Sequence, residues 1–341
     1  MADVITFGEA MIRLYPPDFK RIEQTETLNL SVGGAEWNVA VDLARLSVGS
    51  SWVSVLPDNP LGRLIRNKAR ENGVDTSKII FKKDGRVGLY FVEFGSSPRA
   101  SRVYYDRENS AISCMDLNDI DWDEVFEGAK WFHTTGITPA LSENCAKVTE
   151  IAIKKAKEKG LTVSYDLNYR SKLWSSEEAK KTTERFIEYV DFCLGNEEDA
   201  EKVLGIKVEK AKKGDFGEID KEMYKEIINE MVKKYKFKYA GVSLRESLSV
   251  LRNRWSGLLY ADGNFYLSKS YEIEIVDRLG GGDSFTAGLI YSFINKKDYK
   301  EAIEFAVAFS ALKQTIPTDV NWVTYQEVED LIKKGGARIK R

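Results

Sequence analysis

The stretch "DRLGGGDSF", residues 277–285, places three consecutive glycines and an aspartate between two regular segments. Residues 271–276 before it have the β-branched pattern of a strand, and residues 284–294 after it have the apolar character of a helix. Glycines at such a junction let the backbone approach an anion at the positive end of a helix. Asp283 would repel that anion unless it served as a base for an attacking hydroxyl group. By itself, the stretch is explained equally well by a flexible turn in which Asp283 caps the helix.

Short β-like runs alternate with longer amphipathic segments along the chain. We expect strands at residues 4–7, 51–56, 130–134, 161–166, 192–196 and 239–244. We expect helices at residues 34–46, 61–72, 142–159, 176–190 and 221–235. This alternation predicts an α/β fold with a mostly parallel central sheet and helices on both faces. We interpret residues 1–341 as a single domain.

One region breaks this alternation. Residues 86–93 (RVGLYFVE) and 101–107 (SRVYYDR) have the pattern of two adjacent strands joined by a short loop. A hairpin does not extend a parallel sheet easily, so we expect a small β-lid built from segments near 11–33 and 86–108. The exposed strands of such a lid invite pairing, which predicts a homo-oligomer formed through the lid. We interpret residues 208–219 as a charged surface insertion.

Composition narrows the functional classes. The 341 residues include 51 Lys and Arg against 53 Asp and Glu, a net charge of −2, which predicts neither a nucleic-acid partner nor membrane binding. No apolar run approaches the roughly 18 residues that span a bilayer, and no secretory signal is visible. The spacing of Cys114, Cys145 and Cys193 fits neither disulfides nor a zinc site, so we expect a cytoplasmic protein. We assign the single histidine, His133, no catalytic role.

A second glycine motif lies near the start of the chain. In "SVGGAEWNVAVDLARLS", residues 31–47, Gly33 and Gly34 open a predicted helix and Asn38 lies near its first turn. The glycines permit close approach of a polyhydroxy ligand, and the amide of Asn38 can both donate to and accept from hydroxyl groups. Taken alone, a glycine turn before an ordinary amphipathic helix is the simpler interpretation.

Together, the two stretches resemble the two signature motifs of the ribokinase-like (PfkB) carbohydrate kinases, in the order expected for that family. Within the family, the chain is most similar to the 2-keto-3-deoxygluconate kinases, on the stretches VGLYFVEFG, YDRENSA, HTTGITPAL, DLNYRSKLW, VSLRES and IPTDVNW. The resemblance covers essentially the whole chain and implies a ribokinase-like fold with a β-lid. It also implies ATP and Mg²⁺ as cofactors and phosphorylation of the terminal (C6) hydroxyl of the sugar acid, giving 2-keto-3-deoxy-6-phosphogluconate.

The resemblance implies a role for each site residue. Asp283 would be the catalytic base beside an anion hole formed by Gly280, Gly281 and Gly282. The residues expected to bind the substrate are Gly34, Asn38, Tyr90, Tyr105, Arg107, Arg170 and Asp319. Those expected to bind the nucleotide are Asn168, Asn196, Ser243 and Arg245, with Asp166 as a further partner of phosphates or metal-bound water. Asp199 would contact Mg²⁺ through water.

The residue types agree with a sugar acid as substrate. Arg107 and Arg170 could neutralise and orient its carboxylate, a group that a neutral sugar lacks. Each arginine could equally be a partner in a surface ion pair. Tyr90 and Tyr105 could close over the substrate from the lid, although packing within the hairpin explains Tyr105 nearly as well.

Three positions depart from the family pattern. Asp199 replaces a glutamate and is one methylene shorter, Thr318 replaces a glycine before Asp319, and Gly281 replaces an alanine. The alternatives to a sugar-acid kinase are a fructokinase or another sugar kinase of the family, a dinucleotide-dependent oxidoreductase, and a sugar-binding regulator without activity. No G-x-G-x-x-G follows the first strand, which argues against the oxidoreductase. The gluconate and galactonate epimers differ in one hydroxyl, whose partner no motif identifies.

Overall fold

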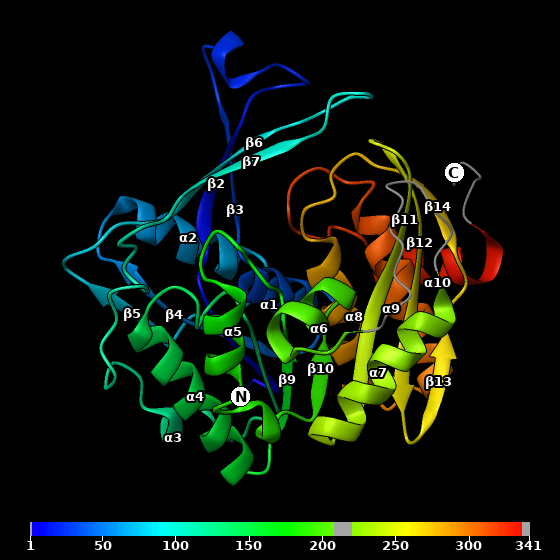
Figure 1. Cartoon of the computed structure of the whole chain (residues 1–341). Coiled ribbons are helices and arrows are strands. Elements are labelled where there is room, and N and C mark those ends of the chain that lie inside the picture. The colour runs from blue at the N-terminus through cyan, green and yellow to red at the C-terminus, as the bar shows by residue number, and fades with distance from the viewer. Residues whose placement is uncertain (1, 208–219, 336–341) are drawn as a thin grey trace.

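A ten-stranded, mostly parallel β-sheet forms the centre of the protein (Figure 1). The structure, a computed structural model, describes residues 2–207 and 220–335, so the predicted insertion at 208–219 lies outside the described residues. Its strands lie in the order β13-β12-β11-β10-β9-β8-β1-β4-β5, and β14 pairs with β12. Neighbours from β11 to β5 are parallel, whereas β12 is antiparallel to β11, β13 and β14. The strands are β1 (Val4–Phe7), β4 (Ser50–Pro57), β5 (Ile79–Lys82), β8 (Trp131–Thr135), β9 (Thr162–Asp166), β10 (Phe192–Leu194), β11 (Tyr239–Ser249), β12 (Arg252–Ala261), β13 (Asn264–Leu267) and β14 (Tyr271–Glu274).

Helices cover both faces of this sheet, which confirms the predicted α/β fold class (Figure 1). Successive residues of a strand point to opposite faces: on β8, Phe132 packs into one hydrophobic cluster and Trp131 into the other. The helices of the first cluster are α3 (Trp122–Val125), α4 (Glu143–Glu158), α5 (Ser176–Thr183), α6 (Glu197–Leu204) and α7 (Lys221–Tyr235). Those of the second are α1 (Ala35–Arg45), α8 (Gly281–Ile294), α9 (Tyr299–Lys313) and α10 (Tyr325–Lys334), and α2 (Pro60–Glu71) packs beside α1. None of the helices in the described residues has the length and apolar character needed to cross a membrane.

One predicted helix is interrupted. Residues 176–190 form α5, which ends at Thr183, and a separate 3-10 helix, η2 (Ile187–Tyr189). Between them Phe186 is fully buried, and its ring contacts that of Tyr165 with 5.3 Å between the centroids. Phe186 thus occupies a core position in the break between the two helices.

The strand before the glycine loop differs from a central strand. β14 ends at Glu274, two residues before the predicted end, and pairs antiparallel with β12. Because β12 is itself antiparallel to β11, β14 runs in the same direction as β11. The loop that follows therefore leaves the sheet at the edge where the parallel strands end, which is where α/β sheets bind ligands.

A separate four-stranded sheet projects above this edge (Figure 1). Its order is β3-β2-β6-β7, with β2 antiparallel to β3 and parallel to β6, and β6 antiparallel to β7. The strands are β2 (Met11–Tyr15), β3 (Asn29–Gly33), β6 (Leu89–Glu93) and β7 (Arg102–Asp106), and a 3-10 helix, η1 (Ile22–Gln24), lies between β2 and β3. The predicted hairpin and the predicted lid segments are thus present, and we call this sheet the lid.

Candidate active site

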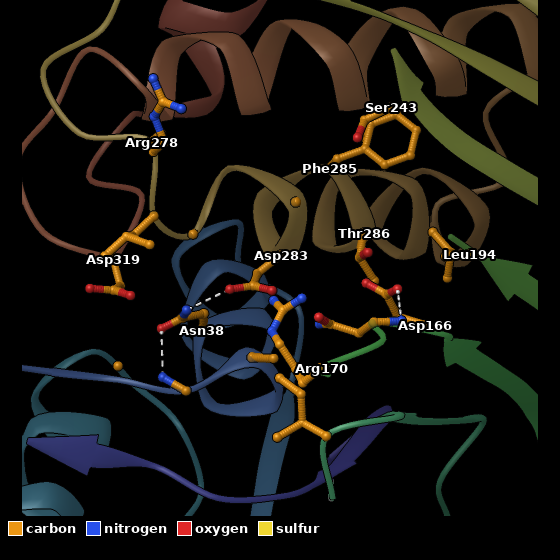
Figure 2. Close-up of a pocket in the computed structure, with 18 of the residues that line it drawn as sticks. Asn38, Asp166, Arg170, Leu194, Ser243, Arg278, Asp283, Phe285, Thr286 and Asp319 are labelled. Atoms are coloured by element: carbon orange, nitrogen blue, oxygen red, sulfur yellow. Dashed lines mark hydrogen bonds between the residues drawn. The ribbon is translucent and has the colours of Figure 1, made fainter. Parts of the chain in front are cut away.

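A cavity of about 350 Å³ lies between the lid and the carboxyl ends of the parallel strands. Its wall combines the ends of β9 and β10, the middle of β11 and the first turns of α1 and α8 (Figure 2). Tyr90 of β6 and Tyr105 of β7 add the lid side of the wall. The volume falls in the range of small-molecule sites. All the predicted substrate- and nucleotide-binding residues line this cavity, and they come from segments that are distant in sequence. Of the predicted anion-hole glycines, Gly280 and Gly282 line it and Gly281 does not.

Asp283 occupies the first turn of α8, at the centre of the cavity wall. The helix begins at Gly281, not at the predicted Ser284, so Asp283 is not the capping residue. Its Oδ2 accepts a hydrogen bond of 2.6 Å from Nδ2 of Asn38, whose own Oδ1 accepts one from the Gly34 amide at 3.4 Å (Figure 2). Burial raises the pKa of Asp283 to about 6, although the hydrogen bond from Asn38 opposes this. An aspartate with this pKa can take up a proton near neutral pH.

The three glycines before Asp283 differ in what surrounds them. Gly280 has φ +79°, and a Cβ there would lie 2.1 Å from the carbonyl oxygen of Asp319. A Cβ on Gly281 would touch the side chain of Gln314 at 3.3 Å. A Cβ on Gly282 would meet no atom within 4 Å, and Gly282 lines the cavity. The fold therefore requires Gly280, whereas at Gly282 the absence of a side chain leaves open space beside the unpaired amides of the helix start.

The β3–α1 junction forms the opposite side of the cavity. A Cβ on Gly33 would lie 2.2 Å from the hydroxyl oxygen of Tyr90, and a Cβ on Gly34 would lie 2.1 Å from the carbonyl oxygen of Glu9. The absence of a side chain at Gly33 therefore lets Tyr90 of the lid approach this junction. The absence of one at Gly34 lets the β1–β2 connection approach it. Tyr90 is buried, and its hydroxyl group lies beside the carboxylate of Asp319. Burial, followed by the charge of Asp319, raises the pKa of Tyr90 well above its usual value. Tyr90 and Asp319 thus form a neighbouring polar pair in the cavity wall.

The two predicted carboxylate-binding arginines reach the cavity from different elements. Arg107, just after β7, donates from Nε to Oε2 of the buried Glu9 at 2.8 Å. Arg170, after β9, is exposed and extends toward Asp283, whose pKa its charge lowers (Figure 2). The alternative for each arginine was an ion pair on the exposed surface. The ion pair of Arg107 with Glu9 is largely buried, and both Arg107 and Arg170 line the cavity. Tyr105 is exposed and stacks on Tyr90 with 6.1 Å between ring centroids, so it belongs to the cavity mouth and to the hairpin at once.

The predicted nucleotide side is built partly from side chains that already have partners. Asn196 caps α6: its Oδ1 accepts from the Asp199 amide at 3.0 Å, and Asp199 Oδ2 accepts from the Asn196 amide at 2.9 Å. Asp199 Oδ1 accepts from the Tyr169 amide at 2.9 Å. Both carboxylate oxygens of Asp199 thus accept hydrogen bonds from main-chain amides of the protein. One of these bonds belongs to the cap of α6, which the aspartate reaches although it is one methylene shorter than the glutamate of the family pattern.

Asp166 is the carboxylate with a strongly perturbed pKa on this side. Burial, followed by the charges of Asp199 and Asp283, raises the pKa of Asp166 to about 8. Its Oδ1 accepts from the amide of Asn168, which has φ +37°. Among the described residues, no three His, Cys, Asp or Glu side chains form a group that could hold a metal ion by themselves.

Cations also line this part of the cavity. Ser243 and the exposed Arg245 extend from β11, and Arg278 donates from Nη2 to the Val250 carbonyl at 2.6 Å. Burial and the nearby charge of Arg245 lower the pKa of Arg278. Two guanidinium groups held this close favour an anion between them. The sequence did not single out Arg278, although it lies within the glycine motif.

Thr318 occupies the position where the family pattern has glycine. Its φ is +72°, a conformation that suits glycine and strains a β-branched residue. The Thr318 amide donates to Oδ2 of Asp277 at 3.0 Å, which holds the residue in place. The carboxylate of Asp319 still reaches the cavity, so the substitution strains the backbone without removing the predicted substrate residue.

A family model described as "pfkB family carbohydrate kinase" matches residues 1–317. The chain belongs to this family. It is 35% identical over 340 residues to the 2-dehydro-3-deoxygalactonokinase of Haloferax volcanii, covering 100% of this chain and 99% of that protein. It is 26% identical to the 2-dehydro-3-deoxygluconokinase of Bacillus subtilis, covering 95% and 93% of the two chains. The crystal structure of the Thermotoga maritima 2-dehydro-3-deoxygluconokinase is 47% identical, with a TM-score of 0.92 over 97% of this chain and 98% of that one.

These comparisons confirm the predicted family and the ribokinase-like fold, and they make the chain a carbohydrate kinase. The family match therefore decides against the alternative of a dinucleotide-dependent oxidoreductase. Sequence reasoning missed four buried charged residues in or behind the site of this pfkB kinase, namely Glu9, Arg13, Asp277 and Lys313. The available signal was Arg13, a charged residue within the otherwise apolar strand pattern "MIRLY".

Proposed function

We propose that this pfkB kinase transfers the γ-phosphoryl group of ATP to the terminal hydroxyl of 2-keto-3-deoxygluconate. The observation that carries this proposal is the juxtaposition of Asp283, with a pKa of about 6, and the open face of Gly282 at the start of α8. A base and an anion-binding helix terminus at one point are what transfer of a phosphoryl group to a hydroxyl requires.

In the proposed reaction, the terminal hydroxyl donates its proton to Asp283 as its oxygen forms a bond to the γ-phosphorus. The bond between that phosphorus and the bridging oxygen of ADP breaks, so the products are ADP and 2-keto-3-deoxy-6-phosphogluconate. Amides at the start of α8 hold the negative charge of the transferred group. Asn38 keeps the carboxylate of Asp283 oriented toward the substrate through its 2.6 Å hydrogen bond.

The choice of a sugar acid rests on the arginines. Arg107 and Arg170 would hold the substrate carboxylate, and Arg107 is already fixed by Glu9, which leaves other N–H groups free to donate. The neighbouring hydroxyl of Tyr90 and carboxylate of Asp319 would bind the sugar hydroxyls. Names of relatives support a 2-keto-3-deoxy sugar acid as substrate.

A divalent cation fits the donor set at the nucleotide side. Mg²⁺ prefers oxygen ligands and keeps several waters, so Asp166, with Asp199 behind water, would hold it together with the phosphates. Asp166 and Asp199 both line this side of the cavity, and burial, followed by the charge of Asp199, raises the pKa of Asp166 to about 8, which a bound cation would oppose. When bound, Mg²⁺ would neutralise charge on the phosphates of ATP. Arg245 and Arg278 would supply further positive charge on the same side.

The test is the release of ADP by the purified protein with ATP and Mg²⁺. We would offer 2-keto-3-deoxygluconate, its galactonate epimer, fructose and ribose in parallel. Turnover restricted to the two sugar acids is the expected result. Preference for fructose would identify a fructokinase and contradict the role given to Arg107 and Arg170, while no turnover of any sugar would favour a regulator without activity.

The galactonate epimer is the second candidate substrate. It is supported by the name of the Haloferax volcanii relative, whereas the more similar crystal structure bears the gluconate name. The ratio of kcat/KM for the two epimers in the same assay decides between them.

A further inference from the structure

Arg13 is a fully buried arginine that joins the lid to the main sheet. It lies on β2 of the lid, and its side chain has an exposed fraction of 0%. Its Nη2 donates to Oδ2 of Asp277 at 2.6 Å, and its Nη1 donates to Oδ1 of Asp319 at 2.7 Å. Burial opposes its charge, but Asp319 and Asp277 more than compensate and raise its pKa. None of the steps described above uses this residue.

Lys313 completes a charge-balanced group. Its buried Nζ donates to the Asp277 carbonyl at 3.1 Å. Burial lowers the pKa of Lys313, and the charges of Asp277 and Asp319 oppose this. We call Arg13, Asp277, Lys313 and Asp319 the buried charge cluster. It contains two carboxylates and two cations, so its formal charges cancel away from water, where an unpaired charge is costly.

The cluster touches both functional halves of the cavity. Asp277 begins the glycine loop: its Oδ1 accepts from the Leu279 amide at 3.1 Å and its Oδ2 from the Thr318 amide at 3.0 Å. Asp319 faces the cavity, and its carbonyl oxygen lies where a Cβ on Gly280 would be. The guanidinium group of Arg13 therefore binds both Asp277, at the start of the glycine loop, and Asp319, which we propose binds the substrate.

We propose that Arg13 is a positioning residue that aligns the substrate-binding carboxylate of Asp319 with the phosphate-binding loop. By holding Oδ1 of Asp319, it orients the other carboxylate oxygen, which lies beside the Tyr90 hydroxyl in the cavity wall, and it fixes the distance between the bound sugar and the amides of α8. Because Arg13 belongs to the lid, the lid and the loop are held in register whenever this guanidinium is in place. A lysine cannot reproduce the arrangement, since its single nitrogen cannot make the two parallel contacts that a guanidinium makes.

The test compares Arg13→Met, Arg13→Lys, Asp319→Asn and the double variant Arg13→Met/Asp319→Asn. The matched control is Arg86→Met, since Arg86, just before β6 of the lid, also pairs with an aspartate, Asp106, at 2.6 Å, but its side chain is 39% exposed. For each variant we would measure thermal unfolding and the kcat and KM for the sugar. The inference rests on the proposed function only for the site's location. The sugar used is therefore whichever one the wild-type protein turns over best, so an error in the substrate leaves this test intact.

We expect Arg13→Met to raise the KM for the sugar and to lower kcat/KM about tenfold or more, with partial recovery in Arg13→Lys. Because Arg13 acts through Asp319, adding Arg13→Met to Asp319→Asn should raise the KM no further. Arg86→Met should behave as wild type.

A purely structural role gives a different pattern. Loss of folded protein lowers the apparent kcat but leaves the KM of the folded fraction unchanged, so an unchanged KM in Arg13→Lys overturns the proposal. The proposal is also overturned if Arg13→Met raises the KM for the sugar by the same factor in the wild type and in Asp319→Asn. If Arg13→Met fails to fold, Arg13→Lys and the double variant, in which the formal charges of the cluster again cancel, carry the comparison.

Discussion

Replacing Asp283 with asparagine separates the catalytic task of this residue from its place in the fold. Asparagine has the same shape and can still accept the 2.6 Å hydrogen bond from Asn38, but it cannot take up a proton. Loss of a general base lowers turnover by about a hundred- to ten-thousandfold. We therefore expect kcat of Asp283→Asn to fall within that range while the KM for the sugar changes little.

The same substitution should stabilise the protein at neutral pH. Burial raises the pKa of Asp283 to about 6, from the 3.8 of an exposed aspartate. The stability that this group contributes is fully present below about pH 4 and is lost as the pH rises through 6, because the folded state resists ionisation. At pH 7.5 the ionised carboxylate thus costs up to about 3 kcal/mol, which asparagine removes.

Denaturant unfolding at pH 4 and pH 7.5, combined with initial rates, measures both effects. The expected result is a more stable and nearly inactive variant at pH 7.5, with most of the stability difference gone at pH 4. In the wild type, kcat should fall below about pH 6 as the base is protonated. A variant that is less stable at both pH values, or one that keeps kcat within tenfold of wild type, would refute the reasoning.

Four further changes test other parts of the site and the fold. Arg107→Ala should raise the KM about tenfold or more for a sugar acid and less for fructose, as measured by initial rates; equal changes would argue against carboxylate recognition. Gly282→Ala should fold normally, because its Cβ meets no atom within 4 Å, yet raise the KM for ATP; an unchanged KM would move the phosphates elsewhere. Burial raises the pKa of Glu36 to about 7, so Glu36→Gln should increase the free energy of unfolding by up to about 3 kcal/mol at pH 8 and hardly at pH 4, in denaturant titrations. Leu30→Glu places a charge on an exposed lid residue and should reduce the mass measured by light scattering; an unchanged mass would contradict assembly through the lid.

Local patterns explain why so much of the fold was predictable. Helix α7 begins and ends at the predicted residues, and the lid strands lie within the predicted segments, because each is set by periodicity over neighbouring residues. The interruption near Phe186 was not predictable from local periodicity, and the contact of Phe186 with Tyr165 joins residues from different elements of the core. The helix start at Gly281 was missed because glycines normally weaken a helix, whereas here the left-handed Gly280 sets the first turn.

Charge pairs between residues far apart in sequence were the part of the site that the sequence could not predict. The motif residues Asp283, Asn38, Gly34, Gly280 and Gly282 line one cavity, as the sequence predicted that they would lie together, whereas Gly281 does not line it. Arg13 was missed because its two partners lie 264 and 306 residues away in sequence, and no local pattern pairs residues over such distances. The glycine-to-threonine change at position 318 was visible in the sequence, but its cost became clear only from a φ of +72°.

The site divides its work between main chain and side chains. In the proposed reaction, the phosphate at the start of α8 would be held by peptide N–H groups, and among the amino acids only proline lacks one. The sugar would be held by side chains, and several of these, including Tyr90, Tyr105 and Arg107, belong to the lid or its margin and not to the central sheet. Point mutations can therefore exchange one sugar preference for another without touching the core or the phosphate-holding groups. A fold arranged in this way can evolve toward new acceptors while it conserves one chemical step.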